Sequence, residues 1–289
     1  MTDYGHDLLF GTFVTPSVQG AGHVLDLAVA ADRAGLDLVT FQDHPYQSAF
    51  LDTWTLLAYA AARTERIHLA GNVLNLPLRP PALLARAAAS LDVLSGGRLE
   101  LGLGAGAFWD GIEAMGGRRL TPAEGVRALR EGIGVIREVW DTDTKGGVHH
   151  RGEFYTVDGA KRGPRPAHEI GIWVGAYKPK MLELTGAVAD GWLPSMSYLP
   201  DGADSLPGLN ARIDDAAVAA GRAPGDVRRL LNFMDAGPSS SADWAEQLAD
   251  LALTHGISGF IVGGDDLATT ERLAAEVAPA VREIVSKER

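Results

Sequence analysis

The sequence contains no cysteine among its 289 residues. Disulfide bridges, thiolate metal ligands and a cysteine nucleophile are therefore all excluded. Positive charge is also scarce, because 26 Lys and Arg residues stand against 37 Asp and Glu residues, which gives a formal net charge of -11. Nucleic-acid binding requires clustered Lys and Arg side chains at the phosphates, so this balance argues against a nucleic-acid partner.

Long apolar runs are missing as well. No stretch approaches the roughly 20 apolar residues that cross a membrane, and the N-terminal MTDYGHDLLFGTFVTP has no basic start followed by a long apolar segment. We therefore expect a cytoplasmic protein without a membrane partner. The G-x-S-x-G elbow of many Ser-His-Asp hydrolases is absent too. A hydrophobic content of 46% is nevertheless enough for a large core.

Apolar runs of strand length alternate with longer segments of helical periodicity, which is typical of parallel βαβ units. The predicted strands are 8–14, 37–41, 67–72, 98–104, 170–175, 191–194, 229–235 and 257–262. The predicted helices are 23–35, 50–64, 81–97, 122–140, 179–191, 241–256 and a final segment, 268–287. Eight strands close a barrel, so the sequence predicts an α/β fold of the (β/α)₈ TIM-barrel type. The alternative is an open doubly wound sheet, which would have to lose one or two of the weaker strands.

We expect one domain over residues 1–289, interrupted by an insertion. Residues 141–169 are polar, rich in Gly and Pro, and contain VHHRGEFYTV, which indicates a short hairpin or extended excursion before the fifth strand. Long insertions of this kind in a barrel are usually lids or cofactor covers, so this segment is our candidate lid. A second irregular stretch, 195–208, follows the sixth strand.

The active sites of such barrels lie at the carboxyl ends of the strands. The second strand is followed by Asp43 and His44 in LVTFQDHPYQ, and a histidine at this end can exchange a proton near neutral pH. The alternative is a structural histidine that holds the loop after the strand. Asp43 could orient His44 or cap the next turn. We take His44 and Asp43 as the candidate catalytic pair.

Two glycine-containing turns lie at the same predicted end. Gly104 and Gly106 in GLGAGAFWDG would let the backbone approach a ligand closely. In GAYKPKM, a helix begins at Pro179 between Lys178 and Lys180, which combines free N–H groups, the positive end of the helix dipole and two cations. This second turn predicts a phosphate site.

Large aromatic side chains recur near the predicted strand ends and indicate a wide apolar substrate pocket. The candidate pocket residues are Tyr46, Phe50, Trp54, Phe108, Trp109, Trp192 and Tyr198. The adjacent His149 and His150 would point to opposite faces of an extended strand. We therefore expect no metal site in this protein.

With these motifs, the chain resembles the bacterial-luciferase-like family of flavin- or deazaflavin-dependent oxidoreductases. The likeness runs almost end to end and is strongest in LDVLSGGRLELGLGAG. It implies a barrel that holds a flavin-type ring at its carboxyl end, supported by a bulge with a non-proline cis peptide at Gly71-Asn72-Val73. The cofactor-binding residues then expected are Phe13, Gly71, Asn72, Val73, Gly104, Ala105, Gly106, Gly175, Ala176, Tyr177, Lys178 and Lys180.

Within this family, the DH pair after the second strand resembles the branch that uses the deazaflavin F420. The basic residues Lys161, Arg162 and Arg165 could meet the anionic tail of that cofactor. Ala107 stands where the sugar-phosphate dehydrogenases of this branch carry an acidic residue, so a less polar substrate than glucose-6-phosphate is expected.

The resemblance therefore implies hydride transfer between F420 and a small, fairly apolar carbonyl, imine or activated alkene, with His44 as proton donor or ring-positioning group. One alternative is an FMN-dependent monooxygenase that uses reduced flavin and O₂. The other is a non-catalytic flavin-binding protein. A homodimer is the family expectation.

Overall fold

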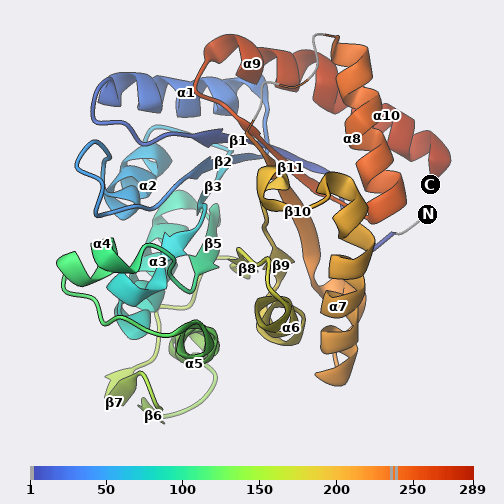
Figure 1. The fold of residues 1–289 in the computed structure, drawn as a ribbon. Coiled ribbons are helices and arrows are strands. Elements are labelled where there is room, and N and C mark those ends of the chain that lie inside the picture. The colour runs from blue at the N-terminus through green and yellow to red at the C-terminus, as the bar shows by residue number, and fades with distance from the viewer. Residues whose placement is uncertain (1–2, 235–236, 238–239) are drawn as a thin grey trace.

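The computed structural model describes residues 3–234, 237 and 240–289. Its centre is a closed barrel of eight parallel strand positions, with the helices on the outside (Figure 1). The barrel strands are β1 (Leu9–Val14), β2 (Leu38–Phe41), β3 (His68–Gly71), β5 (Leu99–Gly104), β8 (Ile172–Val174), β9 (Gly191–Trp192), β10 (Arg228–Phe233) and β11 (Gly259–Gly263). The predicted TIM barrel is confirmed, and the open doubly wound sheet is not formed.

Two pairings close the ring. β1 pairs with the last strand, β11, with Leu9 opposite Gly259, and β3 pairs with β5, with Leu69 opposite Leu99. A short strand, β4 (Leu74–Asn75), continues beyond β3 and also pairs with β5. All eight predicted strands are present within a few residues of their expected limits. The predicted end of the seventh, Asp235, lies outside the described residues.

The helices enclose this barrel. They are α1 (Ala21–Ala34), α2 (Thr53–Ala61), α3 (Pro81–Ser95), α4 (Trp109–Ala114), α5 (Pro122–Trp140), α6 (Pro179–Val188), α7 (Leu206–Ala219), α8 (Ser241–His255), α9 (Leu267–Arg272) and α10 (Ala278–Glu288). A π-helical turn, Leu273–Val277, joins the last two. Among the described residues, no helix is long and apolar enough to cross a bilayer.

The limits of several helices follow from local chemistry. Gly35 and Gly256 end α1 and α8 in the left-handed conformation, which glycine adopts without strain. Thr121 begins α5 with a reciprocal capping box to Glu124. One prediction was wrong: the second irregular stretch ends at Leu206, where α7 begins with Pro207 in its first turn. Proline is accepted there because the first turn leaves its N–H groups unpaired in any case.

The segment 141–169 contains the predicted hairpin, formed by β6 (Gly147–Arg151) and β7 (Thr156–Lys161) in antiparallel pairing. It packs against α5, below the barrel in the view of Figure 1. The carboxylate of Glu131 on α5 accepts hydrogen bonds from the backbone amides of Glu153, Phe154 and Tyr155 at the hairpin tip. The role of this segment as a lid stays a prediction.

Glycine is required where β5 passes the end of β3. A Cβ atom at Gly102 would clash with the carbonyl oxygen of Gly71 and approach the Val73 side chain to 3.3 Å. Since the obstacle is backbone, it cannot move aside as a flexible side chain would. By contrast, a Cβ atom at Gly134 in the middle of α5 would meet no atom within 4 Å.

We therefore expect opposite effects from two glycine substitutions. Gly134→Ala should raise the free energy of unfolding by about 0.5–1 kcal/mol, because alanine is the better helix former. Gly102→Ala should lower it by at least about 1–3 kcal/mol, as overpacking does in closely packed interiors. Urea unfolding of both variants beside the parent measures the difference, and a Gly102→Ala variant as stable as the parent would contradict the packing described here.

Candidate active site

A cavity of about 540 Å³ opens at the carboxyl ends of the barrel strands. This volume is in the range of small-molecule sites. The predicted site residues that line it are Phe13, Asp43, His44, Tyr46, Asn72, Val73, Gly104, Ala105, Gly106, Phe108, Gly175, Tyr177, Lys178 and Tyr198. The fold thus brings together fourteen residues from separate predicted motifs, and it places them at the end of the barrel where we expected them.

The base of the cavity is a bulge between β3 and β4. The peptide bond between Asn72 and Val73 is cis, as the family resemblance implied. A Cβ atom at Gly104 would come within 2.8 Å of the Val73 side chain, and one at Gly175 within 3.4 Å. Glycine at these two positions therefore gives the Val73 side chain the space it occupies. Gly71 itself is buried behind the bulge and is not part of the cavity lining.

A pair of asparagine side chains spans the barrel beneath this bulge. Nδ2 of Asn72 donates to Oδ1 of Asn232 at 2.8 Å, and Nδ2 of Asn232 donates back to Oδ1 of Asn72 at 3.2 Å. Asn72 also donates to the hydroxyl of Thr40 at 3.2 Å, and Asn232 donates to that of Ser195 at 3.4 Å. These reciprocal bonds fix the orientation of both amides and tie β10 to the bulge.

His44 lies on the wall of the cavity in a partly apolar setting. Its Nδ1 lies 2.7 Å from the hydroxyl of Tyr46, and its ring meets the edge of Phe108 at 5.3 Å between ring centres. Burial lowers the pKa of His44, and the nearby carboxylate of Asp43 opposes this only in part. Among the described residues, Nε2 has no hydrogen-bond partner. At neutral pH the ring is therefore uncharged, with one nitrogen held and the other available to a ligand.

Asp43 is directed away from its neighbour. Its fully buried carboxylate accepts hydrogen bonds from Nε and Nη2 of Arg79, at 3.1 and 2.8 Å, and from the backbone amide of Asn75 at 2.8 Å. Arg79 has a second, half-exposed partner in Asp52 at 3.2 Å. No hydrogen bond joins Asp43 to His44 in the described structure. Asp43 instead holds the loop after β2 against the segment after β4, through its bonds to Arg79 and Asn75. Its role is therefore to position this loop.

Three of the predicted pocket aromatics, Tyr46, Phe108 and Tyr198, line the cavity. Tyr46 and Phe108 lie 5.9 Å apart, and Tyr198 contacts the ring of Tyr177 edge-on at 5.6 Å. Four other aromatics predicted for the pocket do not line the cavity, namely Phe50, Trp54, Trp109 and Trp192. Phe50 stands behind His44, with ring centres 6.4 Å apart. Trp192 is fully buried, and its indole N–H donates to the carbonyl of Ala176 at 2.9 Å, which holds the turn after β8.

The turn after β8 places one lysine in the cavity. Lys178 caps the N-terminus of α6 and contributes to the lining. Lys180, two residues further in the first turn of α6, is exposed and pairs with Glu183 at 2.7 Å. The predicted phosphate site is therefore reduced to Lys178 and the backbone around it. Ala176 is buried under the turn and reaches no part of the cavity surface.

Lys161, Arg162 and Arg165 are absent from the described lining of the cavity, and their contact with a cofactor tail stays a prediction. These residues precede β8 and so lie at its amino end, across the barrel from the cavity. Arg162 donates to the carbonyl of Glu138 and pairs with Asp141, and Arg165 pairs with Asp143. The charges of Arg162 and Arg165 are thus largely neutralised by the residues at and beyond the end of α5.

Several lining residues were missed by the sequence analysis, among them Asn75 and Asn232. Asn232 could have been found, since it is a polar residue near the end of the apolar strand RLLNF. Asn75 gives a further indication of function. Its Oδ1 is buried and accepts no hydrogen bond within the described part of the chain. A buried acceptor of this kind suits a ligand that carries an N–H or O–H group.

The comparison with protein families gives one match over most of the chain. The family model described as luciferase-like monooxygenase matches residues 4–283. Among curated proteins, the F420-dependent glucose-6-phosphate dehydrogenase of Kribbella flavida is 30% identical over 267 residues, which covers 89% of this chain and 78% of the relative.

Solved structures share the fold at lower identity. An F420-dependent secondary alcohol dehydrogenase in complex with an F420-acetone adduct superposes with a TM-score of 0.80 at 18% identity, covering 96% of this chain and 99% of the other. A riboflavin lyase with modified FMN and riboflavin gives 0.82 at 14% identity, covering 96% and 92%. These likenesses establish the shared barrel.

The Asp43–Arg79 pair gives a test of the positioning role. Asp43→Asn should lower the free energy of unfolding by about 3 kcal/mol, because it leaves the Arg79 charge without its buried counter-ion. Asp52→Asn is the matched control and should cost less than about 1 kcal/mol, since its pair is half-exposed and asparagine still caps α2. Denaturant unfolding measures both, and equal costs for the two variants would contradict the assignment.

Proposed function

Because the chain belongs to the luciferase-like monooxygenase family, we propose that it is an oxidoreductase that transfers a hydride between F420 and a small, fairly apolar organic substrate. The relative from Kribbella flavida, which is 30% identical and named as F420-dependent, supports this cofactor. The observation that carries the proposal is His44 on the wall of the cavity at the carboxyl end of the barrel. It is the only histidine in the described lining.

The residues at the base of the cavity fit a flavin-type ring. Val73 and the backbone at Gly104 and Gly175 offer a surface with few projecting side chains. The unpaired Oδ1 of Asn75 offers an acceptor, and such rings carry N–H donors at one edge. We infer that Asn75 and the bulge hold the ring, while the Asn72–Asn232 amide pair keeps the bulge in place.

The phosphate of the cofactor is assigned to the turn after β8. Lys178 lies at the beginning of α6, where free amide groups and the helix dipole favour an anion. Lys178 is also the only cationic side chain among the described lining residues. Lys180 contributes little to phosphate binding, because Glu183 already pairs with its ammonium group.

F420, when bound, supplies or accepts the hydride. The protein must then transfer the accompanying proton. In the oxidation of an alcohol, the C–H hydride leaves the carbon while Nε2 of His44 takes the hydroxyl proton, and the carbonyl forms; in reduction, the same nitrogen returns the proton to oxygen. Burial holds the pKa of His44 below its usual value, which keeps the ring uncharged and able to accept a proton at neutral pH.

The lining favours a substrate that is less polar than a sugar phosphate. With Lys178 assigned to the cofactor, no second cation in the described lining is left for a substrate phosphate. Ala107, Phe108 and Tyr46 present mainly apolar surface on the side of His44. We therefore propose a small carbonyl compound or its alcohol, with an imine or activated alkene as further members of the class. A homodimer and a cytoplasmic location stay predictions.

The cofactor assignment is tested by titrating the full chain with F420 and with FMN, each oxidised and reduced. We expect F420 to bind in the micromolar range or more tightly and FMN at least tenfold more weakly. Lys178→Ala should weaken F420 binding about tenfold, which corresponds to about 1.4 kcal/mol. Lys180→Ala is the control and should change it less than threefold. Preferential binding of FMN would instead indicate the oxygen-using monooxygenase.

The role of His44 is tested by His44→Gln once turnover of an alcohol or carbonyl is established. The variant should keep its F420 affinity within about twofold and lose about 10²–10⁴-fold in kcat, the usual contribution of a proton-transfer group. Tyr46→Phe, which removes only the hydroxyl at Nδ1, should lose less. A His44→Gln variant with parental kcat would contradict this role: His44 would then serve only in binding, and another group would carry the proton.

The pH profile gives a second readout of His44. For alcohol oxidation the uncharged ring is the active form, and the pKa of His44 lies below the ordinary value of about 6.5. The parental kcat/KM should therefore stay level as the pH falls through 6.5 and decline only at lower pH. That decline should be absent from the residual activity of His44→Gln.

A further inference from the structure

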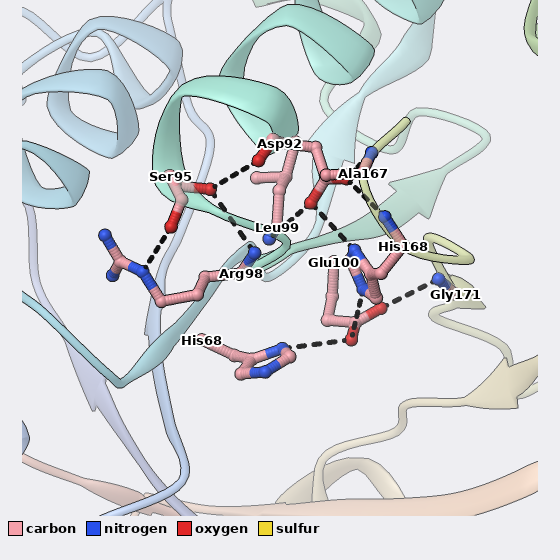
Figure 2. A network of polar contacts seen from close by, with 9 residues as sticks. All are labelled: His68, Asp92, Ser95, Arg98, Leu99, Glu100, Ala167, His168 and Gly171. Carbon is pink, nitrogen blue, oxygen red and sulfur yellow. Dashed lines mark hydrogen bonds and ion pairs between the residues drawn. The ribbon is translucent and has the colours of Figure 1, made fainter. Parts of the chain in front are cut away.

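A second cluster of chemically active side chains lies at the opposite end of the barrel. His68 is the first residue of β3, Glu100 is the second residue of β5, and His168 precedes β8. Figure 2 shows the three side chains converging from these separate segments. They lie at the amino ends of the strands, so the cluster takes no part in the cavity that contains His44.

The distances within the cluster suit a metal ion. Oε1 of Glu100 lies 3.2 Å from Nδ1 of His68 and 3.4 Å from Nε2 of His168. All three atoms lie within 4.8 Å of one another. Two ligands of a tetrahedral zinc ion, with bonds of about 2.0–2.1 Å, are about 3.3 Å apart. The two glutamate-to-histidine distances therefore already match a zinc site.

The surroundings of the cluster orient the ligand atoms. The buried carboxylate of Asp92 lies 2.8 Å from Nδ1 of His168 and also accepts the backbone amides of Ala167 and His168. With Nδ1 donating its hydrogen to Asp92, Nε2 turns its lone pair toward Glu100. The other oxygen of Glu100 accepts the amide of Gly171 at 2.8 Å, which fixes the carboxylate. This carboxylate–histidine arrangement is the usual support of a bound metal.

We propose that His68 Nδ1, Glu100 Oε1 and His168 Nε2 bind one zinc-type divalent ion. Within the described residues, no other group of three such side chains brings its ligand atoms so close together. His68 and Glu100 also line a separate cavity of about 920 Å³ at this end of the barrel, which leaves a fourth position open to water. Two imidazole ligands favour zinc and its transition-metal neighbours over Mg²⁺ and Ca²⁺, which prefer oxygen.

The ion would act as a clamp at the amino end of the barrel. It joins β3, β5 and the segment before β8, which are brought together only by the closed fold. Binding should therefore stabilise the folded chain, as any ligand of the folded state does. The proposal does not depend on the proposed function, because its residues lie outside the cofactor cavity.

The test is calorimetric titration of the full, chelator-treated chain with Zn²⁺, followed by thermal unfolding with and without the ion. We expect one Zn²⁺ per chain with a dissociation constant in the micromolar range or lower, a higher Tm with zinc, and no comparable response to Mg²⁺. His68→Ala and Glu100→Gln should each weaken zinc binding at least tenfold. Asp92→Asn, which touches no ion, should weaken it by about 10–100-fold through His168.

His149→Ala is the matched control, because His149 faces the single carboxylate of Asp158 at 3.0 Å on the exposed hairpin. It should leave zinc binding unchanged. The His68 side chain is partly exposed and, among the described residues, hydrogen-bonds only to Glu100, so the fold of His68→Ala is verified by its metal-free Tm. Absence of stoichiometric zinc binding, or binding that His68→Ala and Glu100→Gln leave intact, would overturn the proposal.

Discussion

The pairing of β1 with β11 is the constraint on which the rest of the structure depends. It closes a ring of parallel strands, and a closed parallel ring has two distinct ends. The cavity with His44 lies at the carboxyl ends of the strands, and the cluster of His68, Glu100 and His168 lies at the amino ends of β3, β5 and β8. Between them the barrel is filled by a separate group of buried side chains that includes Phe13, Trp173 and Ile261. The two ends of the barrel are therefore separate chemical environments, and both result from the same closed ring of strands.

The neighbours Asp43 and His44 have different partners although they are adjacent in the loop after β2. The Asp43 carboxylate pairs with Arg79, and the His44 ring lies on the wall of the cavity. A histidine at the end of a buried strand is thus accessible because its acidic neighbour holds the loop from beneath. The two functions cannot be exchanged: the Asp43 carboxylate is bound by Arg79 and the Asn75 amide, whereas the histidine has one ring nitrogen without a partner in the described structure.

The alternation of apolar runs and helical segments was sufficient to predict the barrel, and the end of each strand was sufficient to predict most of the lining. What could not be predicted are contacts between distant residues. Arg79 lies 36 positions after Asp43, and Asn72 and Asn232 are 160 positions apart. No local periodicity contains such pairs. The helix at Leu206–Ala219 was missed for another reason, because Pro207 and Gly208 in its first turn read locally as an irregular segment.

The net charge of the chain does not exclude a local binding site for an anion. A net charge of -11 argues against a polyanionic surface, yet a single phosphate needs only one well-placed cation and a helix N-terminus. In the apparent basic cluster, Arg162 and Arg165 pair with acidic residues at the other end of the barrel. Lys178 is isolated in sequence, but it projects where α6 begins and lines the cavity. The position of one lysine relative to a strand end is therefore more informative about anion binding than the charge of the whole chain.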